Sequence, residues 1–313
     1  MKFLVTVTGN IPWDAPGITD AHNHVWIDTI SGIEPTGPVL NRFDLIAREL
    51  LDYASTGGSA LVDCQPGECG RNAVMLTRLS KATTVTIISA TGFHRPVYYP
   101  PDHWLWMSPE NQISDYFIQE LTLGERETLN TESPVKAGFI KIACENTVEN
   151  TYLPALHAAA HAARETDRAI EIHTEKGESA IEILDLFLSL GVDPRQVILC
   201  HMDKRPDAGL HRELIQAGAA LEYDTFFRTK YAPETNLWPL IREMIASGLE
   251  NHVCLATDLA ESNYWQSFGG APGLSAFPTQ IKQRLEKMGV PDETIQKLLG
   301  KNICRILATE IRN

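Results

Sequence analysis

Two histidines separated by one residue stand near the start of the chain, His22 and His24 in the segment ITDAHNHVWI. The apolar and β-branched residues around them predict a strand over 18–27, and alternate side chains of a strand point to the same face. Two imidazoles on one face of a strand can bind one divalent metal ion. An H-x-H pair alone does not distinguish a metal site from buried structural histidines. Further candidate ligands elsewhere in the chain are needed to support a metal site.

Three further candidate side chains each end a later apolar run. His173 ends EIH, His201 ends VILCH and Asp258 ends VCLATD. Short runs of this kind are typical of buried strands. If the strands belong to one barrel, their ends converge at its C-terminal mouth, where the active sites of such barrels lie. We therefore expect these three side chains to meet the H-x-H pair in space.

Lys141 lies in the apolar run GFIKIAC, where a charged amine is unexpected. At the same mouth, beside metal cations and apolar walls, its amine would have a lowered pKa. A neutral amine can react with CO2 to give a carbamate, whose two oxygen atoms can bridge two metals. We hypothesise that Lys141 is carboxylated, and an ammonium group paired with a neighbouring carboxylate would argue against this.

These side chains need a scaffold, and the sequence predicts one of alternating strands and helices. Strands are expected at 18–27, 59–65, 83–93, 137–144, 169–174, 197–202, 219–226 and 253–258. Apolar residues at i, i+3, i+4 and i+7 predict helices at 43–58, 72–83, 153–167, 179–193 and 237–249, and a closing helix at 292–311. This alternation favours an α/β fold with a parallel sheet, and eight strands favour a (β/α)8 TIM barrel. We expect one domain over residues 1–313.

Composition narrows the classes of partner. The chain has 313 residues, 43% of them hydrophobic, and a net charge of −13, which makes nucleic acid a poor partner. Gly9, Asn10 and Pro12 interrupt the first apolar stretch too early for a secretory signal. There is no run of about 20 apolar residues of the kind that spans a membrane. The six cysteines are scattered, so we expect reduced thiols and a cytoplasmic protein.

With these pieces in place, the chain resembles the phosphotriesterase-like family of the amidohydrolase superfamily, which includes bacterial lactonases. The resemblance rests on the H-x-H pair, on KAGFIK with Lys141, on His173 and His201, and on Asp258. Softer matches, including ATGFH and SFGGAPGL, extend it over nearly the whole chain. Asn23 stands where the family often has Glu, at a position that is not a metal ligand.

The resemblance implies a distorted barrel of the amidohydrolase type that holds two divalent metals, zinc by default, with manganese or iron as alternatives. The more buried metal would be bound by His22, His24 and Asp258, and the more exposed one by His173 and His201. Carboxylated Lys141 and a hydroxide would bridge them. The hydroxide would attack a carbonyl or phosphoryl centre, and Asp258 would accept its proton.

Basic residues at the mouth suggest the substrate. Arg228 and Lys230 lie in the loop after the seventh strand, and Lys204 and Arg205 follow His201. Such groups can bind a phosphate or carboxylate. We expect a small lactone, with a phosphorylated sugar lactone favoured, and weak phosphotriesterase side activity. His94 follows the third strand and is expected to line the pocket. The aromatic segments 94–111 and 261–274 could form a pocket wall, a lid or a homodimer contact.

Other functions stay open on the sequence alone. A phosphotriesterase or another carboxylic-ester or amide hydrolase would use the same residues. Related barrel deoxyribonucleases share the histidines and the Asp, but they have Glu in place of Lys141, and an acidic protein suits DNA poorly. Single-metal deaminases of the superfamily lack this Lys. A barrel that only binds a small ligand is the last alternative.

Overall fold

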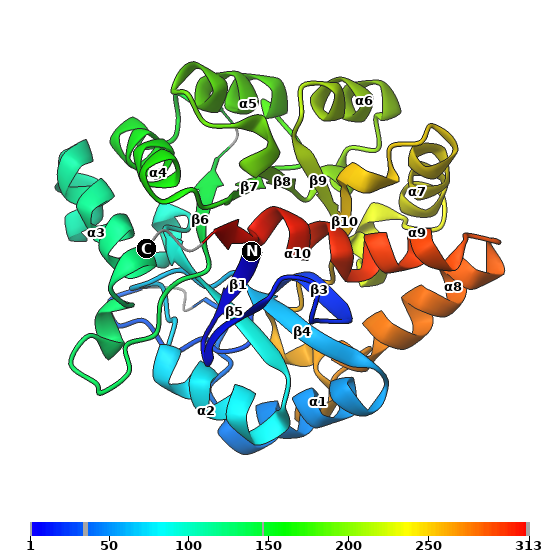
Figure 1. The fold of residues 1–313 in the computed structure, drawn as a ribbon, viewed down its shortest axis with the longest axis horizontal. Coiled ribbons are helices and arrows are strands. Elements are labelled where there is room, and N and C mark those ends of the chain that lie inside the picture. Colours follow the sequence, from blue (N-terminus) through cyan, green and yellow to red (C-terminus); the bar gives the residue numbers. More distant parts are fainter. Residues whose placement is uncertain (1, 34–36, 146, 311–313) are drawn as a thin grey trace.

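Eight parallel strands form the predicted barrel (Figure 1). The computed structural model describes residues 2–33, 37–145 and 147–310. The strands follow chain order around the barrel, and each pairs in parallel with the next. They are β3 (Ile18–Asn23), β4 (Gly58–Asp63), β5 (Thr86–Gly92), β6 (Phe139–Cys144), β7 (Ile170–Thr174), β8 (Val197–Cys200), β9 (Ala220–Tyr223) and β10 (Val253–Leu255). The predicted (β/α)8 fold is confirmed.

Helices on the outside connect the strands (Figure 1). They are α1 (Phe43–Ser55), α2 (Ala73–Thr83), α3 (Glu110–Thr122), α4 (Leu153–Thr166), α5 (Ala180–Ser189), α6 (Ala208–Gln216), α7 (Leu237–Ala246) and α8 (Lys282–Lys287). The predicted set lacked α3, α6 and α8. The available signal for α6 was Asp207, whose carboxylate accepts the backbone N–H groups of Gly209 and Leu210 and so caps the helix.

The C-terminal region differs from the single helix predicted over 292–311. It consists of α9 (Asp292–Gln296), a π-helical turn (Lys297–Lys301) and α10 (Asn302–Leu307), and residue 311 lies outside the described residues. The break falls at Gly300, where an added Cβ would lie 2.6 Å from the carbonyl oxygen of Gly17. The turn therefore bends where the chain packs against the residues that lead into β3.

A small antiparallel sheet lies at the end of the barrel away from the mouth, near both ends of the described chain (Figure 1). Its strands are β1 (Lys2–Thr6), β2 (Gly9–Pro12) and β11 (Thr309–Glu310), with β1 in the centre. The sequence analysis did not predict this sheet, because only four to five residues form each of the first two strands. Leu4 packs there against the barrel interior.

Alternation along the strands explains why Lys141 stands in an apolar run. Its neighbours Ile140 and Ile142 belong to the cluster that packs against the helices, whereas Phe139 belongs to the cluster inside the barrel. Because strand side chains alternate, Lys141 points inward like Phe139. The interior of the barrel is apolar near β1 and polar towards the mouth. The inward-pointing side chains at the C-terminal ends of the strands are therefore the candidates for a functional site.

The first and last barrel strands meet through side chains. Among the described residues no ladder pairs β3 with β10. Instead, the Thr257 hydroxyl donates to Asp20 at 2.5 Å and Asn23 donates to Thr257 at 2.8 Å. The backbone N–H of Asp258 also donates to the carbonyl of His22 at 3.0 Å. Asn23 therefore helps to close the barrel, which brings Asp258 beside the H-x-H pair.

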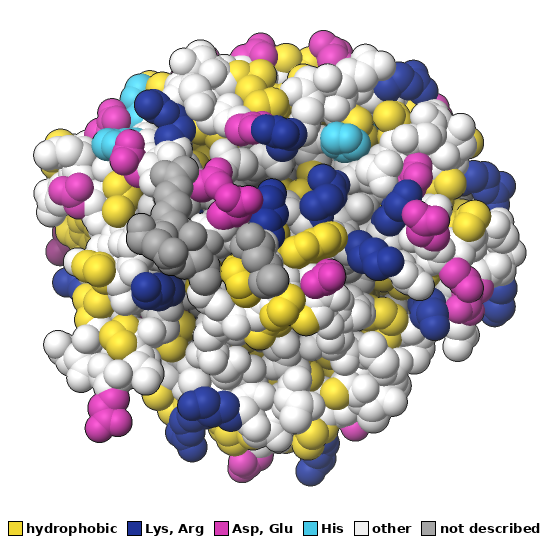
Figure 2. All heavy atoms as spheres, in the orientation of Figure 1, with side chains coloured by type: hydrophobic (Ala, Val, Ile, Leu, Met, Phe, Trp, Pro, Cys, Tyr) yellow, Lys and Arg dark blue, Asp and Glu magenta, His cyan; other side chains and the backbone are white. Residues whose placement is uncertain are grey.

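The cysteines of the described residues form no disulfide bond. All six cysteines are buried and unpaired. Figure 2 shows the face that carries the small sheet and α10, where acidic and basic side chains are interspersed. In the part of the chain that the structure describes, no helix is long and apolar enough to cross a membrane.

Candidate active site

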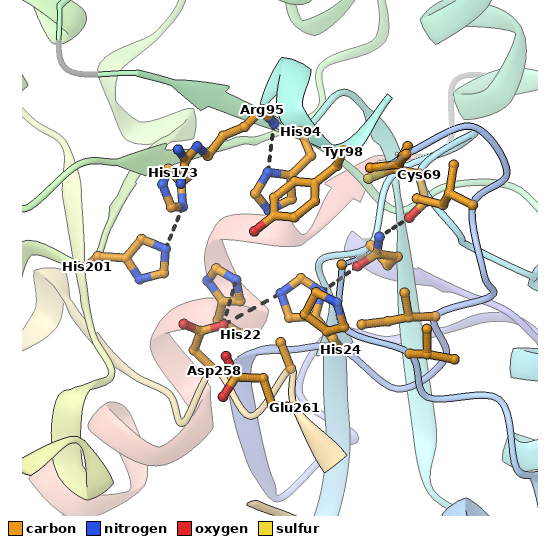
Figure 3. A pocket seen from close by; sticks show the side chains of 18 of the residues that line it. His22, His24, Cys69, His94, Arg95, Tyr98, His173, His201, Asp258 and Glu261 are labelled. Atoms are coloured by element: carbon orange, nitrogen blue, oxygen red, sulfur yellow. Dashed lines mark hydrogen bonds and ion pairs between the residues drawn. The ribbon is translucent and has the colours of Figure 1, made fainter. Parts of the chain in front are cut away.

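The structure brings the four predicted histidines together at the mouth (Figure 3). His22 and His24 come from the end of β3, His173 from β7, and His201 directly follows β8. Their ring centroids lie 5.5 Å apart for His22 and His24, 5.1 Å for His22 and His201, and 4.6 Å for His173 and His201. Asp258, which follows β10, lies among them.

The donor atoms fall into two adjacent groups. His22, His24 and Asp258 each offer one ligand atom, and all these atoms lie within 4.8 Å of one another. Asp258 Oδ1 is 3.6 Å from His24 Nε2 and 3.8 Å from His22 Nε2. His173 Nδ1 and His201 Nε2 are 2.9 Å apart. These groups match the two ligand sets that the resemblance implies.

The outward nitrogen of each histidine has an oxygen partner. His22 Nδ1 lies 2.9 Å from Glu222, and His24 Nδ1 lies 2.7 Å from the side-chain oxygen of Gln65. His173 Nε2 lies 3.1 Å from Glu175, and His201 Nδ1 contacts Asp224. An oxygen acceptor fixes the ring proton on the outward nitrogen, so the inward nitrogen keeps its lone pair. This donor set fits divalent metal ions.

Burial favours the neutral form of three of the rings, those of His22, His173 and His201. His22 and His201 are each 2% exposed. Burial is the largest cause that lowers the pKa of His22, His173 and His201, and for His22 the charge of Lys141 lowers it further. A neutral imidazole is the form that binds metal.

Two of the candidate ligands have an unusual backbone conformation. His201 has φ +63° and Asp258 has φ +47°, in the left-handed region that side chains with a Cβ seldom adopt. Strain of this kind collects at functional sites, where the surrounding structure enforces it. At both positions the strand has just ended, and the turn points the side chain into the mouth.

Arg228 has a contact that the sequence analysis did not predict. Its terminal nitrogen donates to Asp258 Oδ2 at 2.9 Å and to the Asp258 carbonyl at 2.5 Å. Burial alone would raise the pKa of Asp258. The contacts with His24, His22 and Arg228 outweigh burial, so the pKa lies well below its usual range. Arg228 therefore orients Asp258 and favours its ionised form.

Lys141 lies beneath the histidines among buried polar groups that the sequence analysis missed. Its Nζ is 2.8 Å from Glu171 Oε1, 3.1 Å from Cys200 Sγ and 3.4 Å from His22 Nδ1. Burial by itself would lower the amine pKa, but Cys200 and Glu171 shift it well above its usual value. We expected a lowered pKa beside metal cations, and the sequence did not reveal that Glu171 faces Lys141.

A cavity of about 300 Å³ opens above the histidines. His94, Lys204, Arg228 and Lys230 all line it, as expected for the substrate pocket, whereas Arg205 does not. Lys204 and Lys230 lie 5.7 Å and 5.0 Å from the ring centroid of Tyr231. Arg95 lines the pocket as well, but it pairs with Glu145 and Glu175.

Comparison with known proteins agrees with the resemblance. The family model described as "Phosphotriesterase family" matches residues 2–307. A phospho-furanose lactonase of Mycoplasmopsis synoviae is 28% identical, over 98% of this chain and 92% of that protein. The phosphotriesterase homology protein of Escherichia coli is 25% identical, over 93% of this chain and 97% of its own length.

Solved structures agree on the fold. An amidohydrolase from Mycoplasma synoviae superposes with a TM-score of 0.87 at 26% identity, and covers all of this chain and 93% of its own. A lactonase from Listeria monocytogenes superposes with the same TM-score, 0.87, at 22% identity, over 97% of this chain and 98% of that one. Named relatives are hydrolases, which confirms the prediction of an enzyme. The chain belongs to the phosphotriesterase family.

Proposed function

We propose that this enzyme is a metal-dependent lactonase that hydrolyses a small phosphorylated sugar lactone. One observation carries the proposal: four imidazoles from three strand ends gather around Asp258, and the outward nitrogen of each lies beside an oxygen atom. His22, His24 and Asp258 would hold one divalent ion, and His173 and His201 a second. Zinc, manganese or iron would suit these ligands. Such ions, when bound, lower the pKa of water and polarise a substrate oxygen.

Asp258 has the position of the general base. One carboxylate oxygen faces His22 and His24, and the other is held by Arg228. A carboxylate fixed in this way can accept the proton of the attacking water and deliver it to the alcohol that leaves when the lactone ring opens. Arg228 keeps that carboxylate ionised and turned towards the cavity.

Lys204 and Lys230 would bind the phosphate group of the substrate. Both lie over Tyr231, and no carboxylate of the described residues lies within ion-pair distance of either. Burial alone would lower the pKa of Lys204, but Asp224 and Asp258 raise it, so the amine stays charged. The phospho-furanose lactonases among the relatives support a phosphorylated substrate.

Replacing Lys230 with Met should raise KM for a phosphorylated lactone at least tenfold, because a charge-assisted contact worth roughly 1.5–3 kcal/mol is lost. KM for the matching unphosphorylated lactone should stay within about twofold. The exposed Lys136→Met serves as the control for loss of one charge. Equal effects on both lactones would contradict the proposal that Lys230 binds the phosphate group of the substrate.

Arg228→Ala should lower kcat on both lactones, because Arg228 acts through Asp258.

We propose carboxylation of Lys141 as part of the same site, although the ion pair of its amine with Glu171 argues against it. The carbamate can form only after the amine leaves Glu171 and loses its proton. Carbon-13 NMR of protein given labelled bicarbonate and zinc should show one carbamate signal, absent in Lys141→Ala. If the wild type shows no carbamate signal, Lys141 is not carboxylated and serves only as a buried cation.

Metal content is the first test of the proposed function. Protein purified without added metal should contain close to two equivalents of a transition metal by plasma mass spectrometry, and it should hydrolyse lactones. His22→Asn and His173→Asn should each lose about one equivalent, because they belong to different donor groups. A protein that takes up no zinc or manganese, with bicarbonate present, and opens no lactone would refute the proposal.

A further inference from the structure

His94 occupies the wall of the cavity opposite the candidate ligands. It follows β5, whose last residue, Gly92, pairs with Lys141. An added Cβ at Gly92 would lie 1.8 Å from the Lys141 carbonyl oxygen, so the two strands meet tightly here. The His94 ring centroid lies 5.5 Å from that of His173 and 6.4 Å from that of His24. The ring thus faces both donor groups.

The ring proton of His94 can be assigned from one hydrogen bond. The backbone N–H of Arg95 donates to His94 Nδ1 at 2.7 Å. A backbone amide can only donate, so Nδ1 is the acceptor and the proton of the neutral ring is on Nε2. Figure 3 shows Nδ1 turned towards Arg95 and the opposite edge of the ring turned towards His22, His24 and Asp258.

This orientation differs from that of the four candidate metal ligands. Their outward nitrogens face oxygen atoms, which leaves lone pairs pointing into the site. His94 has a donor on its outward side, which leaves an N–H on the inward side. These two kinds of histidine could not be distinguished from the sequence alone.

His94 is also held firmly. Its backbone N–H donates to the Tyr99 hydroxyl at 2.9 Å, and the Tyr98 ring packs edge-on against it at 4.8 Å. A donor fixed before the reaction stabilises developing charge without the cost of reorganisation. Such groups are most effective in a cavity that excludes most water.

We propose that His94 is a catalytic residue that donates its Nε2–H to the carbonyl oxygen of the substrate, an inference that rests on the proposed lactonase function. Water loses one proton to Asp258 and its oxygen bonds to the carbonyl carbon. The electron pair of the C=O π bond moves onto the carbonyl oxygen, where the hydrogen bond from His94 strengthens. The C=O bond then re-forms, the ring C–O bond breaks, and the leaving oxygen takes the proton from Asp258.

The test compares His94→Phe with His94→Gln on the metal-loaded enzyme, using a lactone and its thionolactone, whose sulfur is a weak acceptor. His94→Phe should lower kcat on the lactone by about 10²–10³-fold, the range for loss of one such donor. On the thionolactone the loss should be under about tenfold. His94→Gln, which retains an N–H donor, should recover most of the activity. His161→Phe on the exposed face of α4 controls for the substitution type.

Three results would overturn the inference alone, provided that the wild type opens lactones. They are an unchanged rate for His94→Phe, an equal loss on the lactone and the thionolactone, and a loss of metal content in His94→Phe, which would make His94 a ligand. A metal-loaded wild type that opens no lactone would overturn the proposed function, and the role of His94 with it.

Discussion

The outward nitrogens of the four site histidines decide what the inward ones can do. Three face carboxylates, from Glu222, Glu175 and Asp224, and the fourth faces the neutral amide of Gln65. A carboxylate makes the imidazole more basic and holds its tautomer. The metal affinity of the site should therefore depend on residues that never touch the metal.

Glu222→Gln provides the test at this scale. Glu222 is fully buried and contacts His22 Nδ1 through both carboxylate oxygens. We expect a 10–100-fold loss of affinity for zinc, the usual cost of removing such a partner. Competition with a coloured chelator would measure it. Glu213→Gln, exposed on α6, is the matched control, and equal affinities in the two variants would contradict the argument.

The candidate ligands could be proposed from the sequence, but the side chains that contact them could not. His22, His24, His173, His201 and Asp258 stand out because polar residues that end apolar strands are uncommon. Glu222 and Glu171 each lie two positions before a residue of the site, as in EIH and EYD. They face the same interior, but which ring each one meets depends on the register between neighbouring strands, which the sequence does not reveal.

At the scale of elements, one buried arginine just before α2 holds both α3 and the chain that follows α3. Arg71 pairs with Glu120 and Glu127, and its Nε lies 3.5 Å from Glu125. Glu125 also accepts a hydrogen bond from Ser89 of β5 at 2.5 Å. Burial is the largest cause that raises the pKa of Glu125 to about 8. A single guanidinium thus holds three carboxyl groups, one of them protonated at neutral pH.

This cluster predicts a loss of stability in mild alkali. The folded Glu125 keeps its proton up to about pH 8, whereas an ordinary Glu loses it near 4.5. Its contribution to stability is full below pH 4.5 and is lost as the pH rises through 8, at up to about 1.4 kcal/mol per pH unit. Urea unfolding at pH 6, 7.5 and 9 (roughly spanning that titration) should therefore show a shallower decline for Glu125→Gln than for the wild type. The exposed Glu132→Gln should decline like the wild type.

The main strands and most of the helices follow from the periodicity of apolar residues, and the errors have physical causes. Helix α3 follows an aromatic segment whose pattern has no helical period, and the short turns at 96–98 and 104–107 hide where the helix begins. The predicted C-terminal helix breaks at Gly300 because β3 lies against it. Such contacts between segments distant in sequence leave no local pattern to read.

For the whole molecule, the barrel wall is least continuous where β3 meets β10. Side chains of Asp20, Asn23 and Thr257 join the two strands there. The candidate metal group of His22, His24 and Asp258 takes its ligands from both sides of that seam. A metal bound there would connect the first strand of the barrel to the segment that follows the last.

Metal loading should therefore stabilise the fold. At a free zinc concentration 100 times Kd, binding adds about 2.7 kcal/mol to the free energy of unfolding. Calorimetry should show a higher Tm with zinc, and hydrogen exchange should slow most in β3 and β10. His22→Asn should lose most of this gain. A uniform slowing over all eight strands would place the effect elsewhere.

The seam also has a consequence for the life of the protein in a cell. If one ion both activates water and helps to hold these two strands together, a molecule that loses it loses its reactivity and part of its stability at the same time. When metal is scarce, molecules without the ion would open more often and be degraded sooner, because the opened form is the one that proteases cut. Turnover of the polypeptide would in this way follow the supply of the metal.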